Sequence, residues 1–188
     1  RSVDGLYQQT FEYSPEKIIS HSFYCRDPEY FFGFYKEKML HLDYEPNVTH
    51  QTLARWESEG KNITVVTQNI DGLHQKAGSS SVLELHGSVH RNYCQNCAAL
   101  YDGYYIRDSV GVPKCRCGGI VKPDVVLYEE PLNDETVMKS VDAIANAELL
   151  IVAGTSLTVY PAAGLLNYVP AGTPVYLIDP NDVKVASY

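Results

Sequence analysis

Short apolar runs, each followed directly by polar residues, form the dominant pattern along this chain. The first run covers residues 63–67, is β-branched and uncharged, and passes at once into Gln68. Similar runs occupy residues 82–85, 149–153 and 175–178, and such runs are typical of parallel strands buried on both faces. The segment 131–148 between two of them has apolar residues at helical spacing. Strands alternating with helices predict an α/β fold built on a doubly wound parallel sheet.

Proline-based start signals predict two helices in the first quarter of the chain. Ser14-Pro15 and Asp27-Pro28 each place a capping side chain before a proline at the first helical position. The helix after Pro28 is apolar nearly all round, so we expect it to be largely covered. A further helix is predicted before residue 60, and its His50 is expected to be a hydrogen-bonded structural histidine.

Four of the five cysteines are clustered in two short pairs separated by 17 residues. That arrangement predicts a closed, structural zinc site with four thiolate ligands, the alternative being reduced cysteines without metal. The second pair is C-x-C, so both of its thiols can ligate only if the chain turns sharply, which Gly118 and Gly119 favour. Cys25 stands apart and is expected to be a plain buried thiol. The predicted ligands are Cys94, Cys97, Cys115 and Cys117.

Composition limits the class of protein. The chain has 188 residues, 45% of them hydrophobic, which is enough for one domain with a small inserted module. A net charge of −8 argues against nucleic acid as a partner. No apolar run reaches the length of a membrane span, and no signal peptide is visible, so we expect a cytoplasmic protein without membrane contact.

Polar side chains at three strand ends form the candidate chemical site. Gln68, Asn69 and Asp71 follow the first strand, and His86 follows the second. An amide, a carboxylate and an imidazole at the carboxyl ends of parallel strands can bind a polar ligand and carry out acid–base chemistry. Gly154-Thr155-Ser156 and Asp179 follow the later strands and offer groups suited to ribose. Their convergence predicts a nucleotide site.

Five segments together resemble the sirtuin family of NAD-dependent protein-lysine deacylases. They are TQNIDGLH, ELHG, the four-cysteine cluster, KPDVVLYEE and GTSLTVYPAAG, and the match runs from Arg1 to about Asp179. The resemblance implies one Rossmann-like catalytic domain over 1–188, with a helical module at about 12–45 and a zinc module at about 90–122. The family's first strand and glycine-rich loop are not found in this sequence, so the domain is expected to be incomplete at its N-terminus.

The resemblance also implies the chemistry. NAD is the co-substrate, and the acyl oxygen of an acylated lysine attacks C1′ of its ribose to give an alkylimidate. His86 then acts as general base, Asn69 orients the ribose and a water, and Asp71 holds the nicotinamide amide. The implied products are lysine, nicotinamide and O-acyl-ADP-ribose. The implied NAD-binding residues are Arg1, Gln68, Asn69, Ile70, Asp71, Gly154, Thr155, Ser156 and Asp179.

Acylated-lysine proteins or peptides are the implied partners, bound as an added strand. The Val126 carbonyl is expected to receive the acyl-lysine N–H. The family's usual Phe-Gly-Glu ending is Tyr-Glu-Glu here, with Glu129 replacing glycine. Phe32 and Tyr35 match the Tyr-x-x-Arg positions of succinyl-selective members, and without the arginine a neutral acetyl group is favoured. The implied substrate-binding residues are Val125, Val126, Tyr128 and Leu157.

Two alternatives remain open. One is a sirtuin-like protein ADP-ribosyltransferase, which would use the same ribosyl electrophile with another acceptor. The other is a non-catalytic, zinc-stabilised module that binds peptide or nucleotide. A plain dehydrogenase is disfavoured because the chain lacks a G-x-G-x-x-G sequence.

Overall fold

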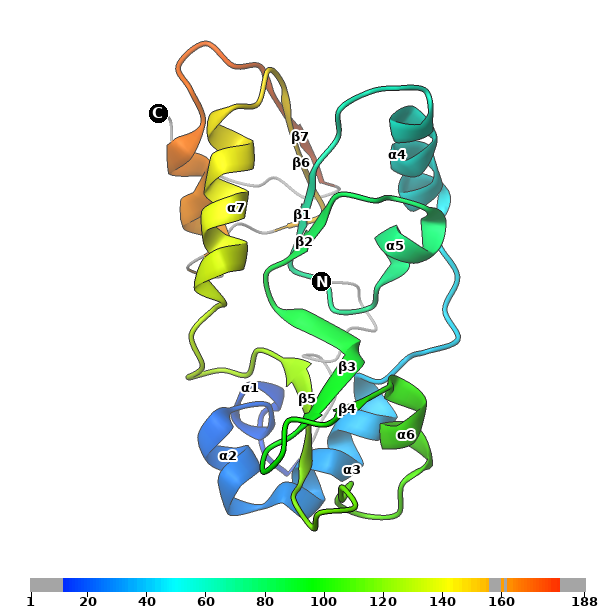
Figure 1. Ribbon diagram of the computed structural model, residues 1–188. Helices are drawn as coiled ribbons and strands as arrows, with labels where there is room; N and C mark the ends of the chain where they lie inside the picture. The colour runs from blue at the N-terminus through cyan, green and yellow to red at the C-terminus, as the bar shows by residue number, and fades with distance from the viewer. Residues whose placement is uncertain (1–11, 156–159, 161, 180–188) are drawn as a thin grey trace. The chain divides into compact units, whose positions relative to one another are not determined.

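The computed structural model describes residues 12–155, 160 and 162–179 (Figure 1). The chain divides into two compact units that meet in sequence at Leu132 and Asn133. The helices of the first unit are α1 (Pro15–Ile18), α2 (His21–Arg26), α3 (Pro28–Lys38), α4 (Val48–Ser58), α5 (Leu73–Ala77) and α6 (Gly103–Asp108). Its strands are β1 (Val65–Thr67), β2 (Val82–Glu84), β3 (Gly87–Cys94), β4 (Leu100–Tyr101) and β5 (Val121–Val125). The second unit contains α7 (Asp134–Ala145), β6 (Leu150–Ala153), the 3₁₀ helix η2 (Ala162–Tyr168) and β7 (Val175–Ile178).

The helix starts follow the predicted capping chemistry. The Ser14 side chain accepts a hydrogen bond from the Lys17 N–H at the start of α1, and Asp27 accepts one from the Tyr30 N–H at the start of α3. At α4, His50 is buried and forms a reciprocal capping box with Asn47. The structural role predicted for His50 is therefore confirmed.

One hydrophobic core joins the first three helices to the antiparallel sheet β4-β3-β5. Helix α3 contributes Phe31 and Tyr35, whose rings stack with centroids 5.8 Å apart. The sheet contributes Val89 and Val121, which are almost fully buried, and α6 contributes Ile106. Burial of this apolar surface is the main force that holds the segment together.

The two parallel strand pairs confirm the predicted α/β fold class. Strand β1 pairs with β2 in the first unit, with Val66 opposite Leu83. Strand β6 pairs with β7 in the second unit, with Val152 opposite Leu177. Cys94 ends β3 of the small antiparallel sheet, and the other three clustered cysteines lie in the turns that connect its strands.

Two expectations about burial are wrong. The residues of β7 are 39% to 60% exposed, and in β6 only Val152 is buried, so these two strands are not buried on both faces among the described residues. Cys25 lies on an exposed face of α2, where residues alternate between core and solvent at helical spacing. Within the described ranges, no helix has the length and apolar character of a membrane span.

Candidate active site and metal centre

His86 lies between β2 and β3 and is half-buried. Its Nδ1 lies 3.0 Å from the backbone carbonyl oxygen of Gln68, so this nitrogen carries the proton and donates it to that oxygen. The neighbouring Leu85 N–H donates to the Thr67 carbonyl, which holds the ends of β1 and β2 together. Burial lowers the pKa of His86, and the Gln68 hydrogen bond opposes that shift in part. The ring is therefore a neutral imidazole whose Nε2 is the basic nitrogen.

Gly87 fixes the backbone beside His86. Its φ is +75°, and a Cβ atom at this position would overlap the carbonyl oxygen of Asp124 on β5. The Val126 N–H donates to the His86 carbonyl at 3.0 Å. The histidine is thus anchored on one side to the loop after β1 and on the other to the segment after β5.

The loop that follows β1 is tied to β3 by backbone and side-chain contacts. The Val89 N–H donates to the Ile70 carbonyl at 3.0 Å, and His90 Nε2 lies 3.0 Å from the Asp71 carbonyl oxygen. The Asp71 side chain accepts from the Leu73 N–H at 3.0 Å, and Asn69 is exposed. The structure therefore places Asn69, Ile70 and Asp71 in one loop, directly after Gln68, whose carbonyl contacts His86.

The second unit holds the later strand ends. The Gly154 N–H donates to the Ile178 carbonyl at 3.0 Å, so Gly154 and Asp179 follow adjacent parallel strands. Gly154 has a φ of +62°, which favours glycine at the turn. Thr155 lies within the described residues, whereas Arg1, Ser156 and Leu157 lie outside them.

The segment after β5 carries the predicted substrate positions. Val125 is buried and pairs with Gly87, and Val126 is half-buried. The Tyr128 backbone is already paired: its N–H donates to the Ile19 carbonyl at 3.0 Å, and its carbonyl accepts from the His21 N–H at 2.9 Å. Tyr128 is 41% exposed, and because its backbone is paired, the side chain is the part available to another molecule.

The four clustered cysteines form a compact thiol centre. Their Sγ atoms all lie within 4.8 Å of one another, and three contacts between pairs measure 3.4, 3.5 and 3.6 Å. A tetrahedron of sulfur atoms about 2.3 Å from zinc has edges of about 3.8 Å. The geometry and the donor type therefore fit structural zinc.

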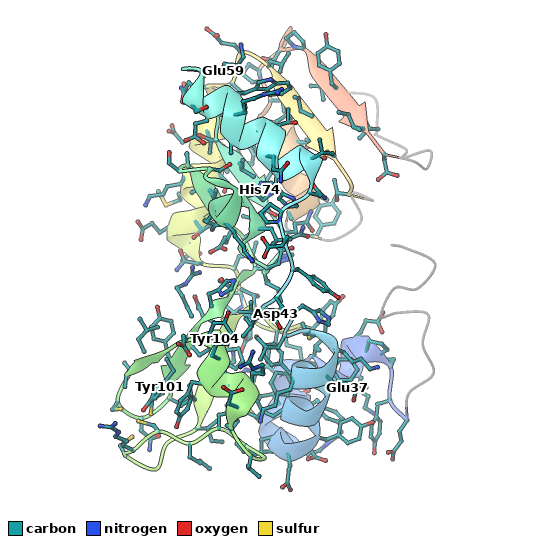
Figure 2. All side chains as sticks on the ribbon, turned by 90° about the vertical axis from the view of Figure 1, so that its right-hand side faces the viewer. Glu37, Asp43, Glu59, His74, Tyr101 and Tyr104 are labelled. Atoms are coloured by element: carbon teal, nitrogen blue, oxygen red, sulfur yellow. The ribbon has the colours of Figure 1, made fainter. Side chains whose placement is uncertain are left out.

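The C-x-C pair is brought to the centre by a tight turn. The Gly118 N–H donates to the Cys115 carbonyl, the Cys115 N–H donates to the Gly119 carbonyl, and Gly118 has a φ of +86°. The Cys117 N–H, together with the hydroxyl of Tyr101 (labelled in Figure 2), lowers the pKa of the Cys115 thiol to about 6. In the same cluster the pKa of Cys97 is raised to about 12 and that of Cys117 is also raised, so Cys115 is held closer to its ionised form than these two thiols.

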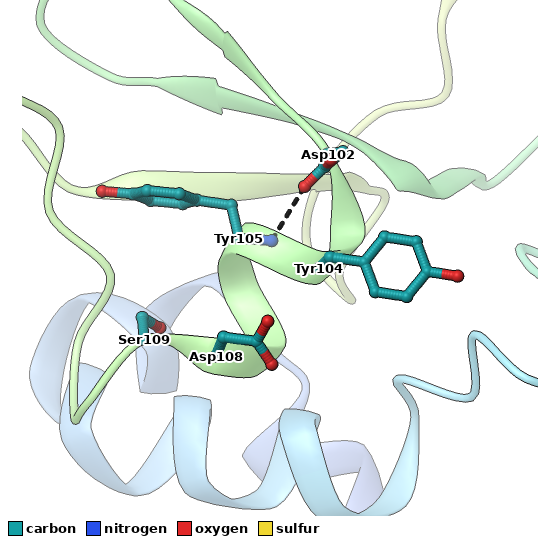
Figure 3. A pocket seen from close by; sticks show the side chains of 5 residues that line it. All are labelled: Asp102, Tyr104, Tyr105, Asp108 and Ser109. Atoms are coloured by element: carbon teal, nitrogen blue, oxygen red, sulfur yellow. Dashed lines mark hydrogen bonds between the residues drawn. The ribbon is translucent and has the colours of Figure 1, made fainter.

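A surface hollow of about 390 Å³ lies on α6 (Figure 3). Asp102 caps the helix by accepting from the Tyr105 N–H at 2.8 Å, and the Tyr105 hydroxyl donates to the Lys114 carbonyl at 2.6 Å. Tyr104, Asp108 and Ser109 complete the lining. These polar groups serve the helix and its loop, and none belongs to the predicted site.

Arg91 is a site-supporting residue that the sequence patterns missed. Its guanidinium donates to Glu84 at 2.7 Å and to Asp124 at 2.8 Å, and it thereby links the strands on either side of His86. Glu84 has a side chain only 8% exposed. A charged residue within the apolar run 82–85 was the available signal, because a carboxylate so placed needs a partner.

Comparisons with known proteins extend over both units. The model of the Sir2 family matches residues 1–161. The NAD-dependent protein deacetylase of Clostridium perfringens is 53% identical over 190 residues, which cover 100% of this chain and 78% of that protein. A solved Sir2 variant with a deacetylated p53 peptide and 3′-O-acetyl ADP ribose has a TM-score of 0.87 and 34% identity, and the match covers 97% of this chain and 75% of that one. Sir2 with a p53 peptide and NAD+ has a TM-score of 0.79 and 33% identity, over 95% and 82% of the two chains.

Proposed function

Because the chain belongs to the Sir2 family, we propose that it is a NAD-dependent protein-lysine deacetylase in which His86 is the general base. One observation carries this assignment: the Nδ1 of His86 is committed to the Gln68 carbonyl at 3.0 Å. That contact leaves Nε2 as the only nitrogen of the ring able to accept a proton.

The base role fits the protonation state of the ring. A general base must be unprotonated at the working pH, and burial holds the pKa of His86 below its ordinary value. Nε2 would accept the proton of a ribose hydroxyl, and the imidazolium formed would keep its hydrogen bond to the Gln68 carbonyl. No large rearrangement is required, since backbone hydrogen bonds already hold Leu85, before His86, to β1 and the His86 carbonyl to Val126 after β5.

NAD supplies the electrophilic C1′ of its ribose and releases nicotinamide. Asn69 orients the ribose and a water, which its exposed amide on an ordered loop would allow. Asp71 would hold the nicotinamide amide, and its carboxylate is oriented by the Leu73 N–H, which it accepts at 3.0 Å. We assign further NAD-binding roles to Arg1, Gln68, Ile70, Gly154, Thr155, Ser156 and Asp179.

The peptide substrate binds beside the segment after β5. Val125 and Val126, with Leu157, supply the main-chain positions for an added strand, which requires little of the peptide sequence. Tyr128 contributes its ring, because its backbone is paired with residues 19 and 21. Phe32 and Tyr35 are fully buried and bring no cationic group, which favours acetyl over a charged acyl group.

Zinc has a structural role in this proposal. Cys94, Cys97, Cys115 and Cys117 would hold it, and four thiolates leave no open position for water. The metal would link the end of β3, which carries Cys94, to the turn before β5, which carries Cys115 and Cys117. A cytoplasmic location belongs to the same proposal, because the thiols must stay reduced to bind the metal.

The identity of the products tests the proposal. The full-length protein is incubated with NAD and an acetyl-lysine peptide, and the mixture is analysed by mass spectrometry. Nicotinamide, O-acetyl-ADP-ribose and the deacetylated peptide in equal amounts are expected. A product carrying ADP-ribose on the peptide would show a transferase instead, and no nicotinamide release would show a binding module.

A further inference from the structure

A second group of reactive side chains lies outside the proposed active site. Cys25 and His21 are one turn apart on α2, and Glu130 comes from the segment after β5. The Sγ of Cys25 lies 3.4 Å from Nε2 of His21, and Nδ1 of His21 lies 2.8 Å from Oε1 of Glu130. A thiol, an imidazole and a carboxylate thus form a continuous chain of contacts.

The order of these contacts determines which nitrogen of His21 is the base. An ionised carboxylate only accepts hydrogen bonds, so Nδ1 must donate its proton to Glu130. In the neutral ring, the lone pair then lies on Nε2, which faces Cys25 Sγ. A nucleophile, a base and a group that orients the base are the arrangement that activates cysteine nucleophiles.

Glu130 is held firmly in its orienting position. The same carboxylate accepts the Leu127 N–H at 2.9 Å and the Lys122 ammonium at 3.1 Å, and its side chain is only 18% exposed. Burial alone would raise the pKa of Glu130, but these donors and His21 together hold it below its usual value. The orienting group is therefore fixed and ionised.

Cys25 differs from the other cysteines in its neighbours. It is exposed and lies apart, whereas the four remaining cysteines, two of which are also exposed, contact one another. An exposed thiol beside a base is the environment in which cysteines react with oxidants and disulfides, while plain buried thiols are inert.

We propose that Cys25 is a reactive thiol that forms mixed disulfides with low-molecular-weight disulfides, with His21 as its base and Glu130 as the positioning residue. The thiol proton passes from Sγ to Nε2 of His21. The thiolate attacks one sulfur of the disulfide, a new S–S bond forms at Cys25, and the original S–S bond breaks. The leaving thiolate takes up the proton, so Cys25 is oxidised to the disulfide level and the displaced half is reduced to a thiol.

Glutathione disulfide is the probe. Trypsin digestion then shows whether Cys25 is the cysteine that reacted. Cleavage after Lys17 and Arg26 gives the peptide 18–26, which contains Cys25 and no other cysteine. The reduced full-length protein is mixed with the probe, samples are quenched in acid, and the gain of one glutathione on this peptide is followed by mass spectrometry. The synthetic peptide 18–26 is the reference, since it keeps His21 and Cys25 but lacks Glu130 and the fold.

Cys25 in the folded protein is expected to react about tenfold faster than the same cysteine in the synthetic peptide. His21→Ala should lower the rate in the protein by a similar factor, and the matched variant His41→Ala, at another exposed histidine, should not. Equal rates for the protein and the peptide would overturn the proposal, whether or not His21→Ala folds. An unchanged rate in a folded His21→Ala would do the same.

The positioning role of Glu130 has a spectroscopic test. In protein labelled with ¹⁵N-histidine, His21 is expected to show the tautomer protonated at Nδ1. Glu130→Gln should shift His21 towards the tautomer protonated at Nε2. The same variant should lower the rate of mixed-disulfide formation at Cys25. A His21 ring protonated at Nε2 in the unaltered protein would contradict the arrangement, because Nε2 could then not serve as the base.

Discussion

Gly87 shows how a single residue without a side chain holds His86, the proposed base, in place. Two features exclude a side chain at this position: the positive φ, and the lack of space for a Cβ atom against the backbone of Asp124. His86 precedes it directly, so a change here would move both the histidine and the start of β3. The requirement is one of backbone geometry, and no other residue type meets it without displacement.

Gly87→Ala is expected to lower the free energy of unfolding by about 3 kcal/mol, from φ strain and displacement of β5. The matched control is Gly33→Ala in α3, where a Cβ atom meets nothing within 4 Å. That substitution should raise stability by about 0.5–1 kcal/mol through helix propensity. Urea unfolding of both variants checks the pair, and equal effects would contradict the close approach at Gly87.

The lowered pKa of His86 predicts the acidic limb of the pH profile. Because the neutral ring is the active form, kcat/KM should fall only below the ordinary histidine value of about 6.5. The same shift makes the folded state more stable above that pH, and this contribution is lost as pH falls through the lowered pKa. An acidic limb with its midpoint above pH 6.5 would show that burial does not lower the pKa of His86.

At the scale of elements, the turn after β5 depends on hydrogen bonds to helix α2, which is distant in sequence. Glu129 has a φ of +77°, in the left-handed region that costs a non-glycine residue about 1 kcal/mol. Its carboxylate accepts the N–H of Ser22 at 2.8 Å and the hydroxyl of Ser22 at 3.0 Å. The helix α2 thus stabilises a turn that glycine would adopt without help.

A double-mutant cycle measures this contact. Ser22→Ala should cost about 0.5–1 kcal/mol of stability when Glu129 is present, because an exposed hydrogen bond to a carboxylate is lost. In a Glu129→Gly background the same change should cost close to nothing. Chemical unfolding of the four proteins gives the coupling energy, and a coupling of zero would mean that Ser22 does not hold this turn.

Sequence patterns predicted those features of the helices and strands that are set by residues close together in sequence. The caps at Ser14 and Asp27 act over three residues, and the runs at 82–85 and 175–178 mark their own strands. The contact of His21 with Glu130 joins residues 109 positions apart, so no local pattern reveals it. The exposure of Cys25 depends on which face of α2 meets the core, and its short helix carries too little periodicity to show that.

At the scale of the whole molecule, the four-cysteine cluster joins the end of β3 to the turn that precedes β5. Cys94 belongs to β3, and the turn with Cys115 and Cys117 precedes β5. The ligand spacing was readable from the sequence. The sharp turn that Gly118 and Gly119 predict, which makes the C-x-C pair usable, is present in the fold.

Cys97→Ser is expected to reduce bound zinc from about one equivalent to a small fraction of it, because three thiolates do not complete the tetrahedron. The unfolding temperature should fall by about 10 °C, the effect of losing several kcal/mol in a protein of this size. Cys25→Ser is the matched control and should leave the metal content unchanged. Full zinc occupancy in Cys97→Ser would exclude the four-thiolate site.

The account as a whole depends on His86 as the base of a NAD-dependent deacetylation. The most direct measurement is a single-turnover reaction of the full-length protein with NAD and an acetyl-lysine peptide, comparing His86→Ala with His41→Ala. We predict that His86→Ala still binds the peptide but forms deacetylated product about 10² to 10⁴ times more slowly, while His41→Ala matches the unaltered protein. Deacetylation by His86→Ala at the unaltered rate would contradict the account.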